Sequence, residues 1–317
     1  MHRIDGPGAT VDNTFTEGDP VGGIQATVVT DDWLNDMQEE LMSLLSAAGI
    51  TPVKGAQDQV LKSIRKVSAG VVGQSRNLSC SVSAASTSAS FTADELVVGS
   101  ALGGLRYCLS GFSKTINLAT VGVSGMDVGL APVSGWVAIY AAYNPSNALS
   151  ATNPMLIGKD ATSALQPEVY SGANMPAGYT ASALIAVVPT NASRQIPQVR
   201  IVDRYHHYFS TIFGGTVASL STFTPISIAA AVPINAKKFT PNMAMSPTSA
   251  INLSASVTPV AAIGSPGYGS LSGYAGTAGI GVFGGQYSVT PILTPQSIFL
   301  AANGNGSITY NSYGYEI

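Results

Sequence analysis

Side chains that can act as acids, bases or nucleophiles are scarce in this sequence. Its 3 histidines are His2, close to the first residue, and the neighbouring pair His206 and His207. A serine–histidine–acid triad would need this pair with an acid such as Asp203, but these residues share one short stretch, RIVDRYHHYF, typical of an interdomain linker or strand end. Adjacent strand residues point to opposite faces, so one chain offers one metal ligand, and three chains around a threefold axis would offer three. We predict a structural or exposed histidine pair, no catalytic residue, no cofactor and no metal, with an ion on such an axis as the alternative.

Carboxylates that could hydrolyse a glycosidic bond are also few. This chemistry needs two carboxylates about 5–10 Å apart. Beyond Val67 the acids are Asp94, Glu95, Asp127, Asp160, Glu168, Asp203 and Glu316. The glycine-rich runs near residues 264 and 276 lack the Lys-Ser/Thr pair and the strand-to-helix setting of a phosphate loop. The sequence therefore predicts a protein that is not an enzyme.

Tyrosine is the residue type with an unusual concentration. Of 13 tyrosines, six lie in the last 50 residues, among Gly, Ser and Asn. Tyrosine offers a rigid amphipathic face with little entropy to lose, which suits the binding of sugars or protein surfaces. Our candidate receptor-binding residues are Tyr268, Tyr274, Phe283, Tyr287, Tyr310 and Tyr313, led by Tyr268 and Tyr274, which we expect in loops. The alternative is that these rings fill the β packing and the core of an oligomer.

Charge divides the chain into two parts. The first 66 residues carry 15 charges, whereas residues 206–317 carry only Lys237, Lys238 and Glu316. A soluble monomer usually covers about a quarter to a third of its surface with charged residues. The charge-poor part must therefore bury its surface against copies of itself or cover it with Ser, Thr, Asn and Gly. Both are expected of an obligate, symmetric oligomer that works outside the cell.

Several classes of protein are excluded by composition. With 45% hydrophobic residues and a net charge of −3, the chain should fold rather than stay disordered. No apolar run reaches the roughly 18 residues of a membrane span, and no apolar segment follows Arg3 as in a secretory signal. No basic cluster beyond Lys237 and Lys238 indicates a nucleic-acid surface.

The N-terminal part predicts an extended arm with turns, followed by two helices. The first helix runs from Thr30, a suitable N-cap, to about residue 48, and Gly49 is a stop signal. A second helix at about 57–67 should complete a small helical hairpin. It should turn Val60, Leu61, Ile64 and Val67 inward. The apolar face of the first helix comprises Trp33, Leu34, Met37, Leu41, Leu44 and Leu45. A three-stranded bundle is one way to cover this face, and direct contact with a neighbouring protein is the alternative.

From residue 69 onward the pattern is that of an all-β protein. Short apolar runs are broken by Gly, Pro or Asn every 8 to 12 residues. Expected strands are 96–98, 105–109, 115–119, 136–143, 181–189, 198–202, 216–220, 226–231, 251–257, 281–283, 298–301 and 308–310. Two cysteines, Cys80 and Cys108, suggest buried thiols rather than a disulfide scaffold, with a bridge as the alternative. We predict a mainly β fold with a small N-terminal helical module, in three domains: 1–68, 69–205 and 206–317.

Residues 6–64 resemble the N-terminal module of tail-fibre proteins from tailed bacteriophages and prophages of Gram-negative bacteria. The resemblance lies in the order FTEG, ATVV, the DWLN–QEEL helix and AAGITP. The segments FTADEL, GGLRY, KTIN, GMD and ANMPAGYT of the middle part also resemble phage tail proteins. Together these cover roughly the first 200 residues.

The resemblance implies a virion protein that forms intertwined homotrimers of sandwich-like or barrel-like β domains. Residues 1–68 would attach to baseplate or tail-tip proteins, and residues 206–317 would adhere to a host pilus, lipopolysaccharide or outer-membrane protein. The alternatives are a structural baseplate connector without a receptor site, and a tailspike depolymerase that acts on surface polysaccharide. The sequence lacks the solenoid body and the greater length usual for such enzymes.

Overall fold

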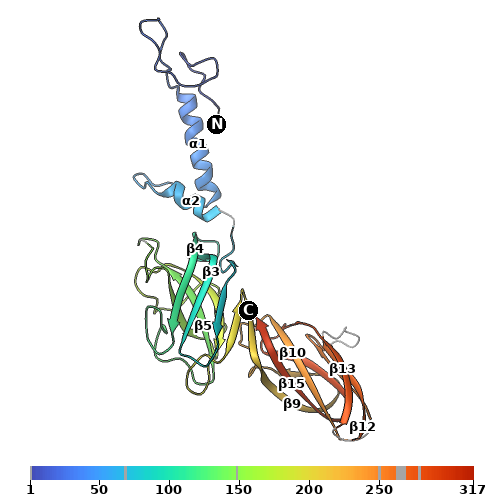
Figure 1. Cartoon of the computed structure of the whole chain (residues 1–317). Helices are drawn as coiled ribbons and strands as arrows, with labels where there is room; N and C mark the ends of the chain where they lie inside the picture. Colours follow the sequence, from blue (N-terminus) through green and yellow to red (C-terminus); the bar gives the residue numbers. More distant parts are fainter. Residues whose placement is uncertain (1, 68–69, 148, 249–250, 262–268, 278–279) are drawn as a thin grey trace. The chain divides into compact units, whose positions relative to one another are not determined.

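The structure, a computed structural model, describes residues 2–67, 70–147, 149–248, 251–261, 269–277 and 280–317. The chain forms two compact units (Figure 1). Unit 1 comprises Met1–Ala69 and Gly103–Arg106, and unit 2 comprises Gly70–Leu102 and Tyr107–Ile317. The prediction of a mainly β protein with a small helical module is confirmed, because 41% of the chain is strand and 10% is helix.

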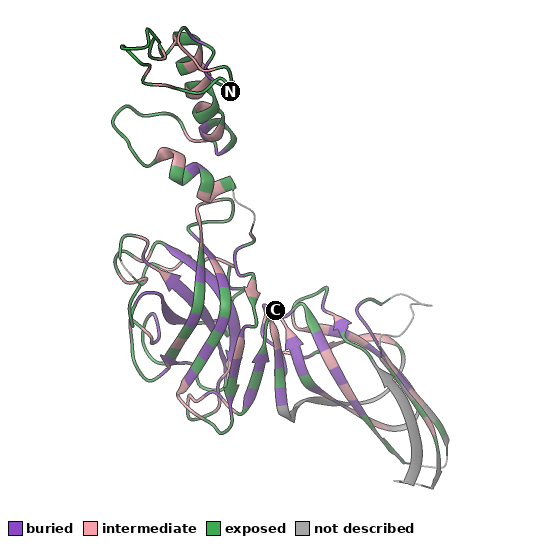
Figure 2. Cartoon of the chain, turned by 45° about the horizontal axis from the view of Figure 1, so that its top comes forward, coloured by how far each residue is buried: buried purple, intermediate pink, exposed green. Residues whose placement is uncertain are grey.

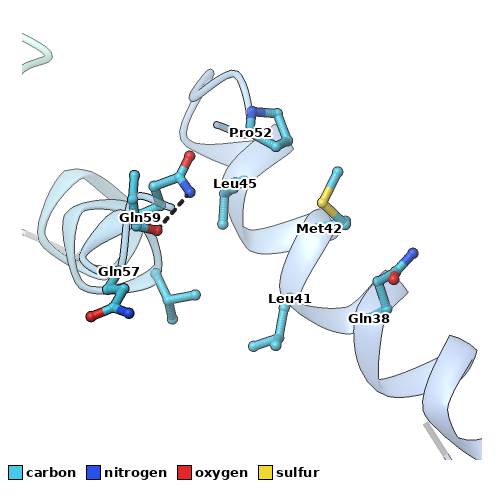
Figure 3. Close-up of a pocket in the computed structure, with 9 residues that line it drawn as sticks. Gln38, Leu41, Met42, Leu45, Pro52, Gln57 and Gln59 are labelled. Atoms are coloured by element: carbon cyan, nitrogen blue, oxygen red, sulfur yellow. Dashed lines mark hydrogen bonds between the residues drawn. The ribbon is translucent and has the colours of Figure 1, made fainter. Parts of the chain in front are cut away.

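Unit 1 contains two helices, α1 (Asp31–Ala47) and α2 (Gln59–Val67). Thr30 caps α1 by accepting a hydrogen bond from the backbone N–H of Trp33 at 3.4 Å. Gly49, with φ of +61°, adopts the left-handed conformation that ends many helices. The two helices do not lie side by side as a hairpin, since α2 runs across the end of α1 (Figures 1 and 3).

The N-terminal arm folds back on the start of α1. Ile4 is buried, and the ring of Phe15 meets Trp33 edge to face at 5.1 Å. The backbone N–H of Val28 donates to the carbonyl of Pro7 at 2.9 Å, which closes the loop between them. The arm therefore contains the expected turns and is anchored on the helix of the same chain.

Unit 2 consists of strands in one hydrogen-bonded network. They are β1 (Ser75–Arg76), β2 (Ser79–Val82), β3 (Ser88–Gly99), β4 (Arg106–Asn117), β5 (Trp136–Tyr143), β6 (Met155–Asp160), β7 (Ala181–Pro189), β8 (Val199–Val202), β9 (Tyr205–Ser227), β10 (Lys238–Pro247), β11 (Ile251–Thr258), β12 (Gly269–Thr277), β13 (Ile280–Tyr287), β14 (Thr290–Pro291) and β15 (Ser297–Glu316). Their main order is β13-β12-β11-β15-β9-β8-β2-β3-β7-β5-β6. β1 and β4 also pair with β3, and β10 pairs with β14 and β15.

The core of unit 2 is densest around β5 and β7. Seven of the eight β5 residues are buried, and so are all β7 residues but the last. Both are continuous apolar runs, as expected of strands covered on both faces. In Figure 2 the strands of unit 2 carry long buried stretches, whereas unit 1 is mostly exposed or intermediate. The sequence predicted β5 and β7 at their observed bounds.

Other strands differ from their predicted bounds. Segments 105–109 and 115–119 belong largely to the single strand β4, in which Gly111 has φ of +59°. Segments 298–301 and 308–310 likewise belong to the single strand β15. The strands that were not predicted are β1, β2, β6, β10, β12 and β14, because short strands give little periodicity and because β10 and β12 contain Pro or Gly. None of the helices in the described ranges is both long enough and apolar enough to span a membrane.

Candidate interaction surfaces

The apolar face of α1 is divided between covered and uncovered residues. Trp33 packs on Phe15, and Leu45 is buried with 5% of its surface exposed. In contrast, Leu34 is 54% exposed and Leu41 44% exposed. The residues left at least partly uncovered, Leu34, Met37, Leu41 and Leu44, follow the three-four spacing of a coiled coil. We call these four residues the α1 seam.

Next to the seam, α1, the following loop and the start of α2 enclose a groove of about 380 Å³ (Figure 3). Its lining residues, the α1 groove, are Gln38, Leu41, Met42, Leu45, Pro52, Ala56, Gln57, Gln59 and Val60. Gln59 fixes one wall, because its side chain accepts from the Val53 N–H at 2.8 Å and donates to the Val53 and Ala56 carbonyls. A second hollow of about 390 Å³ continues past Met42, Leu45 and Pro52. This groove is not evident from the sequence, since it arises from the crossing of the helices.

α2 places its apolar residues differently from the prediction. The position packed inward is Ser63, which is fully buried and donates to the Gln59 carbonyl at 2.9 Å. Leu61, Ile64 and Val67 are 49%, 50% and 47% exposed. The expectation that these three face inward is therefore wrong, because α2 crosses α1 and touches it over a short length. We call Leu61, Ile64 and Val67 the α2 stripe.

The tyrosine candidates fall into three groups. Tyr274 is 59% exposed on β12, a strand rather than the expected loop, and Tyr313 is 47% exposed on β15. Tyr310 is only 6% exposed and donates its hydroxyl to the Ser227 carbonyl at 3.0 Å, so its burial removes it from the candidate receptor residues. Phe283 and Tyr287 belong to β13, and Tyr268 lies outside the described residues.

Tyr313 lies on the outward side with Thr309 and Asn311, as alternation along a strand requires, whereas Tyr315 is buried because strand pairing is irregular at Tyr313. Its neighbours on β15 change register against both β9 and β10 at this point. Such a bulge reverses the alternation of side chains along a strand.

β11 separates β12 from β15, and the pairing of Ser254 with Asn303 places Tyr274 far along the strand direction from Tyr313. At about 3.3 Å per residue the separation is roughly 25–30 Å, so Tyr274 and Tyr313 of one chain do not lie in one site.

The histidine pair lies at the start of β9, with the ring of His206 buried and His207 exposed. The His206 ring is fully buried, with Nδ1 3.2 Å from the Arg204 carbonyl oxygen and no hydrogen-bond partner for Nε2 among the residues that the structure describes. Burial lowers the pKa of His206 to about 3, which keeps the ring neutral. Asp203 lies in the turn between β8 and β9 and accepts a hydrogen bond from the Leu78 N–H. The stretch expected to be an interdomain linker or a strand end contains the end of β8 and the start of β9, so the second expectation holds, and buried His206 cannot supply a ligand on an external threefold axis.

His206 belongs to an aromatic junction inside unit 2, together with Trp136, Tyr208 and Tyr315. Its ring stacks on Tyr315 at 4.5 Å and 12°, and Trp136 meets Tyr315 edge to face at 5.7 Å. The Tyr315 hydroxyl donates to the Val187 carbonyl of β7. The junction therefore ties β5 and β7 to β9 and β15, across the predicted domain boundary at residues 205 and 206.

An ion pair lies in the same region. Arg204 forms hydrogen bonds with both carboxylate oxygens of Glu168, at 3.0 and 3.1 Å, and its Nε donates to the Ile317 carbonyl oxygen at 2.9 Å. Neither the junction nor this pair is evident from the sequence, since their residues are up to 179 positions apart and no motif links them.

The remaining candidates for chemistry are isolated. Cys80 is buried and Cys108 is exposed, and neither is bridged, so the expectation of two buried thiols holds only for Cys80. Across the described ranges, no group of three His, Cys, Asp or Glu residues is arranged to hold a metal ion.

Comparison with known proteins relates part of the sequence to one from Escherichia coli. The similar protein, of strain K12, is named "Uncharacterized protein StfP". It is 42% identical over 71 residues, which make up 20% of this chain and 34% of that protein, so the chain spans about a third of its length. No protein-family model and no solved structure matches the chain. Comparison therefore establishes that about a fifth of this chain is similar to part of StfP.

Proposed function

We propose that the chain is a non-enzymatic tail fibre or receptor-binding protein of a phage or of a tail-like bacteriocin. Three copies form a homotrimer at the baseplate or tail tip of the virion. Residues 1–68 attach to baseplate or tail-tip proteins, and residues 206–317 adhere to a pilus, lipopolysaccharide or outer-membrane protein. The protein is assembled in the host cytoplasm and acts outside the cell, with no nucleic-acid partner and no membrane insertion.

The observation that carries this proposal is the uncovered apolar surface of unit 1. In its described part the buried apolar side chains are Ile4, Leu45 and Ala48, while the α1 seam and the α2 stripe are largely exposed. A module of about 70 residues with so small a core needs further apolar contacts to be stable. Assembly with identical chains and with a neighbouring virion protein supplies such contacts.

Two further findings support the same function. The resemblance of residues 6–64 concerns the tail fibres of phages and prophages of Gram-negative bacteria, and the partial similarity to StfP is to a protein of such a bacterium. Unit 2 combines a large core with few charges and with exposed tyrosines at Tyr274 and Tyr313. Three copies of each tyrosine per trimer would convert weak single contacts into firm adhesion.

Adhesion is tested by adding the full-length protein to susceptible cells. We expect it to bind these cells, to block adsorption of particles that carry it, and to lose binding when either pili or lipopolysaccharide are removed. A well-folded trimer that binds no cells would instead support the structural connector. Release of sugar from host polysaccharide would contradict the non-enzymatic function.

Exposed and buried tyrosines should differ in this assay. Tyr274→Ala or Tyr313→Ala is expected to weaken cell binding at least about tenfold, since truncating an exposed aromatic contact commonly costs that much. Tyr310→Phe serves as the matched control and should bind like the wild type, because Tyr310 is 6% exposed. Binding titrations on cells give both values. Unchanged binding by both alanine variants would remove these tyrosines from the receptor surface.

A further inference from the structure

One face of unit 2 combines aromatic and polar side chains where β9, β15 and β10 lie side by side (Figure 1). On β9, Tyr205 and His207 lie on the face opposite to buried His206. The strand register continues this face through Gly314 of β15 to Thr240 of β10. We call the following residues the β9–β10 face: Tyr205, His207, Thr240, Asn242, Tyr313 and Gly314.

The ring of Tyr205 lies along the sheet instead of standing away from it. Tyr205 pairs with a residue of β15, yet its hydroxyl group forms a hydrogen bond with the Thr240 hydroxyl on β10, the next strand. Between these two groups lies Gly314, where a Cβ would be 3.0 Å from the hydroxyl oxygen of Tyr205 and 3.1 Å from its Cε1. Gly314 therefore leaves the space that the ring occupies.

Neighbouring side chains place a second tyrosine beside this ring. The His207 ring packs on Tyr205, with ring centroids 4.2 Å apart. The Tyr313 hydroxyl accepts a hydrogen bond from the side-chain amide of Asn242 at 3.1 Å. Thr240 and Asn242 are two residues apart on β10, so they hold the two tyrosine hydroxyl groups at points about 7 Å apart. The face therefore presents two tyrosine rings, each fixed by a residue of β10.

Polar groups border these rings. Arg200 of β8 is exposed and pairs with His207 in the strand register. Glu316, opposite Tyr205, forms an ion pair with Lys238 at 2.8 Å. Aromatic rings bordered by amide, guanidinium and carboxylate groups match a pyranose, which has an apolar C–H face and a rim of hydroxyl groups. An apolar protein surface would instead remove water from these polar groups without replacing their hydrogen bonds.

We propose that the β9–β10 face binds a saccharide of the host surface, with one pyranose ring stacked on Tyr205 and the next against Tyr313. Asn242 and Arg200 donate hydrogen bonds to the sugar, and Glu316 accepts one. Because both tyrosine rings are already held in place, binding requires little ordering of side chains. Such an open face binds weakly in one chain, and three copies in a trimer strengthen the attachment. The inference rests on the adhesion in the proposed function and names its ligand class and residues.

Saccharide binding is tested with the full-length protein and two probes from susceptible cells. The probes are capsular polysaccharide and the polysaccharide that mild acid frees from lipopolysaccharide. We expect calorimetric titration to show binding of one of them. We also expect NMR saturation of tyrosine ring protons to transfer to sugar C–H protons. Tyr205→Ala should weaken binding at least about tenfold, whereas Tyr205→Phe keeps the ring and should stay within about threefold of the wild type.

Two further variants separate a binding effect from a folding effect. Tyr313→Ala changes a side chain that is 47% exposed, so it should fold normally and still weaken binding at least about tenfold. Tyr179→Ala is the matched control, since Tyr179 is also partly buried and donates its hydroxyl to the Thr152 carbonyl, outside the β9–β10 face. It should bind like the wild type.

The outcomes distinguish this site from the wider function. Equal losses in Tyr179→Ala and Tyr205→Ala, or wild-type affinity in both Tyr205→Ala and Tyr313→Ala, would overturn the assigned site. If the protein binds intact cells but neither polysaccharide, the ligand is not a saccharide, and adhesion to a protein receptor remains. A well-folded protein that binds no cells would contradict the adhesion itself.

Discussion

Tyr315→Ala is expected to lower the free energy of unfolding of the full-length protein by about 3–5 kcal/mol, as is common for loss of a buried aromatic side chain. Tyr315 is fully buried and contacts Trp136, Tyr208 and His206 in the aromatic junction. Its removal leaves a cavity where β5 and β7 meet β9 and β15. Urea unfolding at a fixed protein concentration measures the change.

Two variants separate packing from other effects of this substitution. Tyr315→Phe keeps the ring and removes only the hydroxyl bonded to the Val187 carbonyl, so it should cost about 1 kcal/mol. Tyr313→Ala changes a tyrosine two residues away that is 47% exposed, and should stay within about 0.5 kcal/mol of the wild type. If Tyr315→Ala and Tyr313→Ala lower the free energy of unfolding equally, the aromatic junction does not stabilise the fold in the way described.

Acid should destabilise the protein through His206. The pKa of this buried ring is about 3 in the folded chain, against an ordinary value of 6.5 once the chain unfolds. Below pH 6.5 the unfolded chain therefore binds a proton that the folded chain does not. The contribution of His206 to the free energy of unfolding is therefore fully present above pH 6.5. It is lost as the pH falls, by up to about 1.4 kcal/mol per pH unit. Between pH 6.5 and 4.5 the loss should be about 2 kcal/mol, before most carboxylates titrate.

The His206→Phe variant should remove most of this pH dependence, because it keeps a ring against Tyr315 and cannot bind a proton. His207→Phe is the neighbouring control. His207 is exposed, and the pKa of His207 is lowered mainly by partial burial, so its variant should retain most of the slope. The pKa of His2 is raised by Asp36, so protonation of His2 opposes the loss of stability at low pH, and it does so equally in both variants. Urea unfolding between pH 4.5 and 6.5 gives the change of unfolding free energy with pH for each variant. If His206→Phe shows the same pH dependence as the wild type, His206 is not its cause.

Local sequence signals predicted the elements that are stabilised locally. The cap at Thr30, the stop at Gly49 and the apolar periodicity of α1 act within one helix, so the sequence contains them in full. The apolar runs of β5 and β7 are equally local, since these strands are covered on both faces.

The features that the sequence did not predict depend on contacts between distant residues. The crossing of α1 and α2 exposes Leu61 and Ile64, which helical periodicity alone would place inside. Ordinary alternation along β15 separates exposed Tyr313 from buried Tyr310, and a register change at Tyr313 then turns Tyr315 inward, although the sequence composition does not distinguish the three tyrosines. Composition identified tyrosine as the residue type of interest, whereas pairing between strands decides which rings reach the surface.

The position of β15 in the sheet has a consequence for synthesis on the ribosome. β15 lies between β11 and β9 and also pairs with β10, so three strands that are synthesised earlier cannot complete their pairing before β15 is made. Sixty-nine residues lie between the end of β9 and the start of β15. At 5–20 residues per second, the nascent chain holds β9 without this partner for about 4–14 s. During that interval the long strand exposes an unpaired edge, and neighbouring nascent copies on one messenger RNA would be the nearest strands available to it.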